Sequence, residues 1–191
     1  EGIHNAQQAG FENIKVNAVI KRGLNEHSVL PLARYFHGTG SILRFIEYMD
    51  VGSTNNWKLD EVVSASELVA TINQEMPIEP LFPNYRGEVA KRWRYADGGG
   101  EVGFITSVTE SFCGDCSRVR LSALGQIYTC LFATEGYDIR DPLRVGVSDQ
   151  DLLEIVRRLW GKREDRYSEL RGQIPVNVFS QPKVEMSHIG G

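Results

Sequence analysis

The sequence has 191 residues, of which 41% are hydrophobic and 24% charged, and its formal net charge is −4. These proportions are typical of a soluble globular protein, and the negative charge argues against a general nucleic-acid binder, which needs a broad basic surface. No apolar run reaches the length of a membrane span, and no signal-peptide pattern opens the chain. The three cysteines are an odd number, which together with the missing signal favours a reducing cytoplasm and thiols used for metal or chemistry.

The first part of the chain predicts a βαβ unit. Residues 3–9 form a helical pattern that ends at Gly10, and residues 14–20 (IKVNAVI) then alternate as a strand. A helix from Ser28 to Phe36 and a second buried strand at residues 42–49 follow. Strand, helix and strand in this order imply parallel neighbours with a right-handed crossover.

A capping box at Ser64–Glu67 opens a further helix, which Pro77 closes. Beyond Pro77 the sequence predicts short β-like runs, followed by a helix from Ser148 to Gly161. The runs lie near residues 89–95, 101–108, 118–122 and 126–131. We therefore expect an α/β region at residues 1–76 and a smaller, mostly antiparallel region at residues 77–191. Because the chain opens on Glu1 with a helical pattern already under way, we expect it to be part of a larger protein.

All three cysteines lie within one stretch, SFCGDCSRVRLSALGQIYTC. Cys113 and Cys116 form a C-x-x-C pair, and the alternation after them predicts a hairpin that turns near Leu124 and Gly125. At about 3.3 Å per residue, such a hairpin returns Cys130 to the neighbourhood of Cys116. The three sulfur atoms can then converge on one point.

Three kinds of site compete for these thiols. A structural zinc site closes with four ligands, and the fourth would be a distant histidine, because none lies between His37 and His188. A redox C-x-x-C usually begins a helix, whereas β-like sequence follows here. An iron–sulfur cluster is held by thiolates, and three of them leave one iron open to a substrate atom. This last site fits the cysteine count best, zinc is its rival, and three unrelated buried cysteines fit the clustering least.

Arg118 and Arg120 share one face of the predicted hairpin. Two guanidinium groups beside a metal site form a forked receptor that suits phosphate. Arginines on an exposed hairpin are usually solvated. Beside the cysteines, a phosphorylated ligand is the better interpretation.

Lys15 and Asn17 lie on one face of the first predicted strand, and its other face is apolar. In an α/β sheet both faces are normally covered, so inward polar side chains are costly unless they bind something. Arg44, on the next strand, can stand beside Lys15. The alternatives are a lysine that reaches water at a sheet edge and a structural salt bridge from Arg44 to Glu47 or Asp50.

The segments IKVNAVIKRG, LRFIEYMDVG and FCGDCSRVRLSALGQIYTCLF closely resemble the GTP 3′,8-cyclases, radical S-adenosylmethionine enzymes also called molybdenum cofactor biosynthesis protein A. The resemblance covers essentially the whole chain, including DRYSE and the terminal Gly-Gly. A C-x-x-C-x-R-x-R hairpin followed by a third cysteine is highly specific. The resemblance implies the C-terminal part of an incomplete (β/α)6 TIM-type barrel, followed by a small antiparallel β plus α region with an iron–sulfur site.

The resemblance also implies roles for particular residues. Cys113, Cys116 and Cys130 would hold a four-iron, four-sulfur cluster whose open iron contacts the guanine of GTP. The GTP-binding roles fall on Lys15, Arg44, Arg118, Val119 and Arg120. The S-adenosylmethionine contacts fall on Met49 and the nearby Asn17, although Met49 can face that site only if its strand ends or bends. Gly190 and Gly191 are expected to reach into the active site and serve catalysis.

One departure from the family limits what this chain can do. The C-x-x-x-C-x-x-C motif, which holds the second cluster and binds S-adenosylmethionine, is absent from it. We therefore expect a C-terminal half that is inactive alone, within an enzyme that converts GTP to (8S)-3′,8-cyclo-7,8-dihydroguanosine 5′-triphosphate for molybdopterin synthesis. A homodimer and a downstream enzyme that takes the product are the expected partners. The alternatives are a non-enzymatic zinc module and a related radical enzyme with another substrate.

Overall fold

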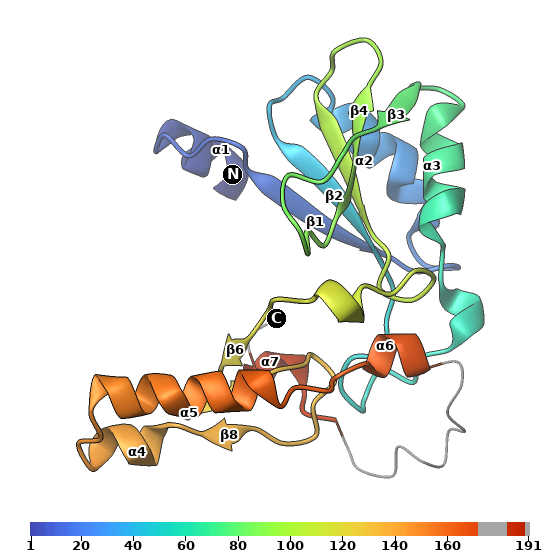
Figure 1. Cartoon of the computed structure of the whole chain (residues 1–191). Helices are drawn as coiled ribbons and strands as arrows, with labels where there is room; N and C mark the ends of the chain where they lie inside the picture. The colour runs from blue at the N-terminus through green and yellow to red at the C-terminus, as the bar shows by residue number, and fades with distance from the viewer. Residues whose placement is uncertain (172–182, 190–191) are drawn as a thin grey trace. The chain divides into compact units, whose positions relative to one another are not determined.

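The structure is a computed structural model that describes residues 1–171 and 183–189. The chain divides into two compact units (Figure 1). Unit 1 comprises Glu1–Met49 and Trp57–Phe112, and unit 2 comprises Asp50–Asn56 and the described part of Cys113–Gly191. Each unit is considered by itself.

Unit 1 is built on a five-stranded sheet of mixed direction, in the order β1-β2-β5-β4-β3. Its strands are β1 (Lys15–Ile20), β2 (Ile42–Glu47), β3 (Ile78–Pro80), β4 (Lys91–Tyr95) and β5 (Glu101–Ile105). Its helices are α1 (Gly2–Gln8), α2 (Val29–Phe36) and α3 (Ala65–Asn73), with short 3₁₀ turns η1 (Glu26–Ser28) and η2 (Leu59–Glu61). The strands β1, β2 and β5 are parallel to one another, whereas β4 pairs antiparallel with β5 and β3 pairs antiparallel with β4.

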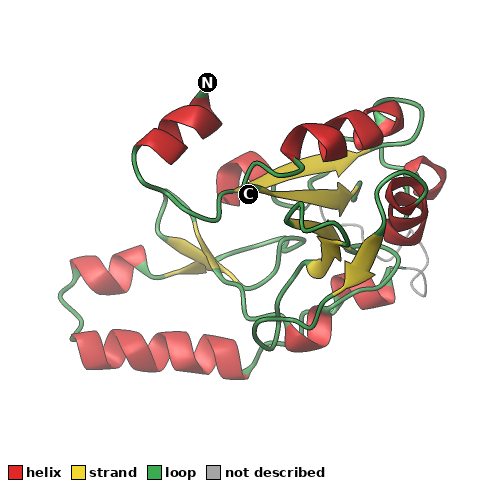
Figure 2. Ribbon diagram, turned by 90° about the horizontal axis from the view of Figure 1, so that it is seen from above, coloured by secondary structure: helices red, strands yellow, loops and turns green. Residues whose placement is uncertain are grey.

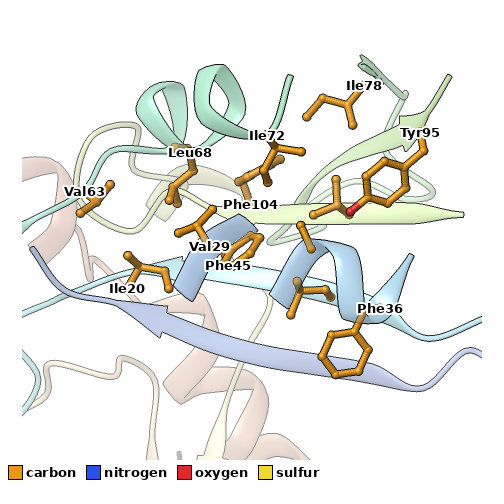
Figure 3. Close-up of a cluster of buried hydrophobic side chains, with 14 residues drawn as sticks. Ile20, Val29, Phe36, Phe45, Val63, Leu68, Ile72, Ile78, Tyr95 and Phe104 are labelled. Carbon is orange, nitrogen blue, oxygen red and sulfur yellow. The ribbon is translucent and has the colours of Figure 1, made fainter. Parts of the chain in front are cut away.

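One face of this sheet carries the hydrophobic core of unit 1. Period-two alternation sends Leu43 and Phe45 of β2 and Phe104 of β5 to this face, where they meet the apolar stripes of α2 and α3 (Figure 3). The rings of Phe45 and Phe104 stack with their centroids 6.0 Å apart. The helix α3 begins at the predicted capping box, in which the Ser64 side chain accepts from the backbone of Glu67 and the Glu67 side chain accepts from the backbone of Ser64.

Unit 2 contains a small antiparallel sheet in the order β6-β7-β8 and several short helices. Its elements are η3 (Cys113–Asp115), β6 (Arg120–Leu121), β7 (Gln126–Tyr128), β8 (Tyr137–Asp138), α4 (Arg140–Arg144), α5 (Asp149–Gly161), α6 (Tyr167–Leu170) and α7 (Met186–Ile189). The helices α4 and α5 follow β8 as a helical hairpin in both views (Figures 1 and 2). The predicted start of the last long helix is confirmed, because Ser148 is the N-cap of α5 and its hydroxyl accepts from the Asp151 amide.

The division between the units differs from the boundary that the sequence suggested at residues 76 and 77. The strands β4 and β5 were expected in the second region, but β5 pairs in parallel with β2 and thereby joins the sheet of unit 1. The α/β part therefore extends to Phe112 and includes the antiparallel strands β3 and β4, and unit 2 contains a separate small antiparallel sheet. Unit 1 by itself is an open sheet, so the partial barrel stays a prediction.

Within residues 1–171 and 183–189, no helix combines the length and the apolar character that a membrane crossing requires.

Candidate metal centre and anion-binding residues

In unit 1, the strands β1 and β2 present a polar face opposite the core. Lys15 and Asn17 are exposed, whereas the alternate residues Val16 and Ala18 are partly buried. Asn17 and Arg44 are direct partners in the parallel register, and the Arg44 Nε donates to the Asn17 Oδ1 at 2.9 Å. The predicted placement of Lys15, Asn17 and Arg44 on one face of neighbouring strands is confirmed, but Arg44 stands beside Asn17. Lys15 is the register partner of Ile42 and is exposed on β1, the edge strand of the sheet, as the alternative stated.

Lys15 and Arg44 differ from most other cations of unit 1 because neither forms an ion pair with any residue that the structure describes. Ion pairs join Lys21 to Glu61, Arg22 to Glu67, Arg34 to Glu75, Lys91 to Glu110, Arg92 to Glu101 and Arg94 to Glu79. Two unneutralised cations on one face of a sheet are suited to an anionic ligand.

The alternative salt bridge from Arg44 to Glu47 or Asp50 is wrong. Glu47 lies on the opposite face and is 1% exposed, and its carboxylate accepts from the backbone amides of Ala65, Val108 and Thr109 and from the Thr109 hydroxyl. Asp50 belongs to unit 2 and pairs with other cations there. Arg44 is left with Asn17 as its hydrogen-bonding neighbour.

Met49 lies just beyond the end of β2. In a continuous strand, Met49 would lie on the face opposite Arg44. The strand ends at Glu47, so the condition under which Met49 could turn to the same face as Arg44 is met. The neighbouring backbone is held in place, because the Trp57 indole donates to the Tyr48 carbonyl at 2.8 Å. The contact of Met49 with S-adenosylmethionine stays a prediction.

In unit 2, Cys113 and Cys116 occupy a short turn at η3. The Cys116 amide donates to the Cys113 carbonyl at 3.2 Å, and the Gly114 amide donates to the Glu169 carboxylate at 3.1 Å. All three cysteines are free thiols and partly buried. Local hydrogen bonds and the helix α6 thus hold the first two cysteines of the motif.

The third cysteine, Cys130, follows β7 in the predicted hairpin. Arg120 pairs with Tyr128 and Leu121 with Ile127, and this register, if continued, sets Cys130 opposite Arg118 as the sequence suggested. However, the ladder ends at Arg120, and the structure groups no three Cys, His, Asp or Glu residues into metal-binding geometry within its described ranges. The expected convergence of all three sulfur atoms on one point is therefore not seen.

The donor set nevertheless suits an iron–sulfur cluster. The Cys116 sulfur accepts from the Arg118 Nε and Nη2, both at 3.3 Å, and the Cys130 sulfur accepts from the Phe132 amide at 3.4 Å. Hydrogen bonds to cysteine sulfur atoms are one way in which proteins tune such clusters. The candidate fourth zinc ligand, His188, instead packs its ring edge-to-face on Tyr128, with centroids 6.2 Å apart.

The electrostatics of these thiols follow from their surroundings. Burial raises the pKa of Cys130, whereas hydrogen bonds from the backbone and side chain of Arg118 overcome burial and lower the pKa of Cys116. Arg120 is partly buried, and burial together with the charge of Arg118 lowers its pKa. Arg120 has no ion pair with any described residue, so no described carboxylate balances its charge.

Sequence reasoning missed Arg163, which follows α5. Its guanidinium donates to the Cys116 carbonyl, is paired with Asp165 at 3.2 Å and lies over the Trp160 ring at 4.9 Å. Although burial opposes it, the hydrogen bond with Cys116 raises the pKa of Arg163. The charged stretch GKREDR gave a signal of polarity, but only the fold brings it to the cysteines.

Unit 2 also contains a buried ionic cluster around Asp50. Its carboxylate lies 2.8 Å from the Arg171 guanidinium and 2.7 Å from the Lys183 ammonium, and it accepts from the Tyr167 hydroxyl. Both cations lie over the Tyr167 ring, which stacks on Phe132 with centroids 4.4 Å apart. These contacts fasten the segment 183–189 to the loop Asp50–Asn56.

The predicted catalytic residues Gly190 and Gly191 lie outside the described residues. Val119, between the two arginines, is 52% exposed.

Comparisons with known proteins identify the family of the chain. A family model described as Molybdenum Cofactor Synthesis C matches residues 41–169. The chain is 50% identical over 190 residues to GTP 3′,8-cyclase of Xanthomonas axonopodis pv. citri (strain 306) and 47% identical over 212 residues to that of Acidothermus cellulolyticus. It is 42% identical over 192 residues to the GTP 3′,8-cyclase of Staphylococcus carnosus (strain TM300).

Each of these alignments covers 100% of this chain but only 55%, 59% and 56% of the three relatives, respectively. The chain therefore spans just over half the length of the curated relatives that it matches. The family model covers more than half of the chain and includes β2, the cysteine motif and both hairpin arginines. On this evidence the chain belongs to the Molybdenum Cofactor Synthesis C family.

Proposed function

We propose that this chain is the C-terminal part of a GTP 3′,8-cyclase and contributes to the binding of a substrate-side iron–sulfur cluster and of GTP. The observation that carries the proposal is the combination of three free thiols, two of which accept N–H hydrogen bonds, with the charge of Arg118 close to the partly buried Arg120. The relatives that align with the whole chain at up to 50% identity bear this enzyme name.

Cys113, Cys116 and Cys130 would hold a four-iron, four-sulfur cluster, which supplies an open iron for the purine of the substrate. Arg118 orients Cys116 through two hydrogen bonds, and Arg163 fixes the same residue through its carbonyl. Closing the site requires the three thiols to come closer together, because the described structure does not group them.

The phosphates of GTP are the proposed ligands of four cations. Lys15 and Arg44 in unit 1, and Arg118 and Arg120 in unit 2, supply positive charge, and Val119 contributes its backbone between the two arginines. A phosphate chain carries several negative charges and matches the planar fork of a guanidinium. Holding the substrate in a fixed orientation is the main contribution of these residues to the reaction.

The reaction assigned to the longer protein is the conversion of GTP to (8S)-3′,8-cyclo-7,8-dihydroguanosine 5′-triphosphate. It needs S-adenosylmethionine, for which Met49 and Asn17 are the proposed contacts here, and a second cluster. The three cysteines of this chain are all assigned to the first cluster, so the chain alone has no thiols for the second. The terminal Gly190 and Gly191 are proposed to complete the active site. A homodimer and a downstream molybdopterin enzyme are the proposed partners.

Arg120 offers the cleanest test of GTP binding, because Arg118 also contacts Cys116. The Arg120→Met variant keeps the aliphatic stem and removes the charge. We expect GTP binding to weaken by about 1.5–3 kcal/mol, as for one lost charged hydrogen bond, in equilibrium titrations of the purified chain. The matched control is Arg140→Met, since Arg140 is already paired with Asp138 and Asp141. Equal affinities for GTP in the two variants would contradict the proposal.

A further inference from the structure

Asn17, Arg44 and Gly103 form one row across three adjacent strands of unit 1. Asn17 of β1 is the register partner of Arg44 on β2, and Arg44 is in turn the partner of Gly103 on β5. Residues in one such row project to the same face of the sheet. The neighbours of the Arg44 side chain on both sides are therefore set by the strand pairing.

Asn17 contacts the inner nitrogen of the guanidinium group. The Arg44 Nε donates to the Asn17 Oδ1 at 2.9 Å, and among the described residues this is the only side-chain hydrogen bond given by Arg44. Because the guanidinium group is planar, fixing Nε also fixes the plane and direction of the two terminal nitrogens. The bond leaves the edge made by these terminal nitrogens, which can bind phosphate in a bidentate manner, open to a ligand.

Gly103 provides the surface over which the Arg44 stem runs. A Cβ atom at position 103 would lie 3.0 Å from the Arg44 Cγ and 3.5 Å from its Cδ. The first distance is shorter than side chains normally adopt, so any larger residue would push the Arg44 stem away from β5. The glycine is needed here for close approach, since its backbone has no positive φ.

The carboxylate on this face of β5 is occupied by another arginine. Arg92 of β4 holds Glu101 in two hydrogen bonds, from Nε at 3.0 Å and from Nη2 at 2.6 Å. The same guanidinium donates to the Phe82 carbonyl and to the Asn84 side chain. Glu101 is thereby kept from neutralising Arg44.

We propose that Asn17 is a positioning residue for Arg44: it orients the guanidinium group toward a phosphate ligand through Nε, and Gly103 leaves room for the stem. This inference rests on the proposed function, in which Arg44 binds a phosphate of GTP. This role differs from a direct contact between Asn17 and S-adenosylmethionine, because here Asn17 acts through Arg44.

The test is a double-mutant cycle between Asn17→Ala and Arg44→Met, with inorganic triphosphate as the probe. Affinity is measured by isothermal titration calorimetry at low ionic strength, and the free energy of unfolding is measured for every variant. We expect Asn17→Ala to weaken triphosphate binding by about two- to tenfold, the value of one hydrogen bond. In the Arg44→Met background the same substitution should have no further effect. Gly103→Ala should also weaken binding only when Arg44 is present.

Val19→Ala is the matched control, since Val19 lies on the same face of β1 and contributes no polar group. A purely structural role for Asn17 predicts reduced stability with unchanged affinity, which would overturn the inference. Equal weakening by Asn17→Ala in both backgrounds would mean that Asn17 contacts the ligand directly, and it would also overturn the inference. If Arg44→Met leaves the affinity unchanged, or if the unaltered chain does not bind triphosphate, the proposed function of Arg44 fails first.

Discussion

The Glu47 carboxylate provides the sharpest test of how unit 1 is held together. It is 1% exposed and accepts four hydrogen bonds, from Ala65 N at 3.0 Å, Val108 N at 2.9 Å, Thr109 N at 2.9 Å and Thr109 Oγ1 at 2.5 Å. These donors belong to the start of α3 and to the loop after β5. The carboxylate therefore joins the end of β2 to two distant segments.

The substitution Glu47→Gln keeps the shape of the side chain but replaces one acceptor oxygen with an NH2 group. Each carboxylate oxygen accepts two of the four bonds, so two bonds to the charged group are lost whichever way the amide turns. With the NH2 group in the place of Oε1, the Ala65 amide faces another donor and the Thr109 hydroxyl must turn to accept; in the place of Oε2, the NH2 group faces the amides of Val108 and Thr109. At about 1.5–3 kcal/mol for each bond to a charged group, the loss is ~3–6 kcal/mol. The lower cost of burying a neutral amide offsets part of this, so we expect a net destabilisation of about 3–5 kcal/mol.

Urea unfolding, followed by circular dichroism and tryptophan fluorescence, measures this loss. For urea slopes of about 1–3 kcal/mol per molar, the midpoint should fall by roughly 1–3 M. The control is Glu79→Gln, because that carboxylate is 56% exposed and, among the described residues, is paired with Arg94 alone. This substitution should cost about 0–1 kcal/mol. If both variants unfold at the same urea concentration, Glu47 does not have the structural role assigned to it.

Three further predictions concern single contacts. Asp50→Asn removes the carboxylate charge that pairs with Arg171 and Lys183 and should destabilise unit 2 by about 3–5 kcal/mol. Hydrogen exchange at the Val184 amide, which donates to Ala133, should rise sharply, and unchanged protection would refute the anchoring role. Gly52→Ala puts a carbon 2.1 Å from the Glu185 carboxylate. It should therefore cost more than the ~1–2 kcal/mol that a non-glycine residue loses in the left-handed conformation. The control is Gly23→Ala, which has open space around it and should lose only that amount in urea unfolding. The hydrogen bond from Arg22, with those from Ser64, lowers the pKa of Glu67 to about 2 from 4.5. The stabilisation by the Glu67 carboxylate is therefore present above pH 4.5 and is lost as the pH falls toward 2. The free energy of unfolding of Glu67→Gln should change less over this window, and parallel pH profiles for the two proteins would contradict the role of these hydrogen bonds.

Features that depend on neighbours in sequence were predictable. The capping box at Ser64 and Glu67 is read from residues three apart, and the structure contains it. The alternation in β1 and β2 correctly grouped Lys15, Asn17 and Arg44 on one face, because a strand repeats every two residues.

Features that depend on long-range pairing were not predictable from the sequence. The parallel pairing of β5 with β2 joins residues about sixty positions apart, and nothing local in either strand specifies the partner. The hydrogen bonds to Glu47 and the contact of Arg163 with Cys116 likewise join residues that are far apart in the sequence. The hairpin register was inferred correctly, but the ladder stops at Arg120, so spacing alone did not fix the position of Cys130.

The most direct test of the account is the metal content of the chain after anaerobic reconstitution with iron and sulfide, with zinc measured in the same samples. The account predicts about four iron ions per chain with broad absorbance near ~400 nm, and loss of this iron in each of Cys113→Ala, Cys116→Ala and Cys130→Ala. A colourless protein that binds one zinc ion, or iron binding that survives Cys130→Ala, would contradict the assignment of these three thiols to an iron–sulfur cluster.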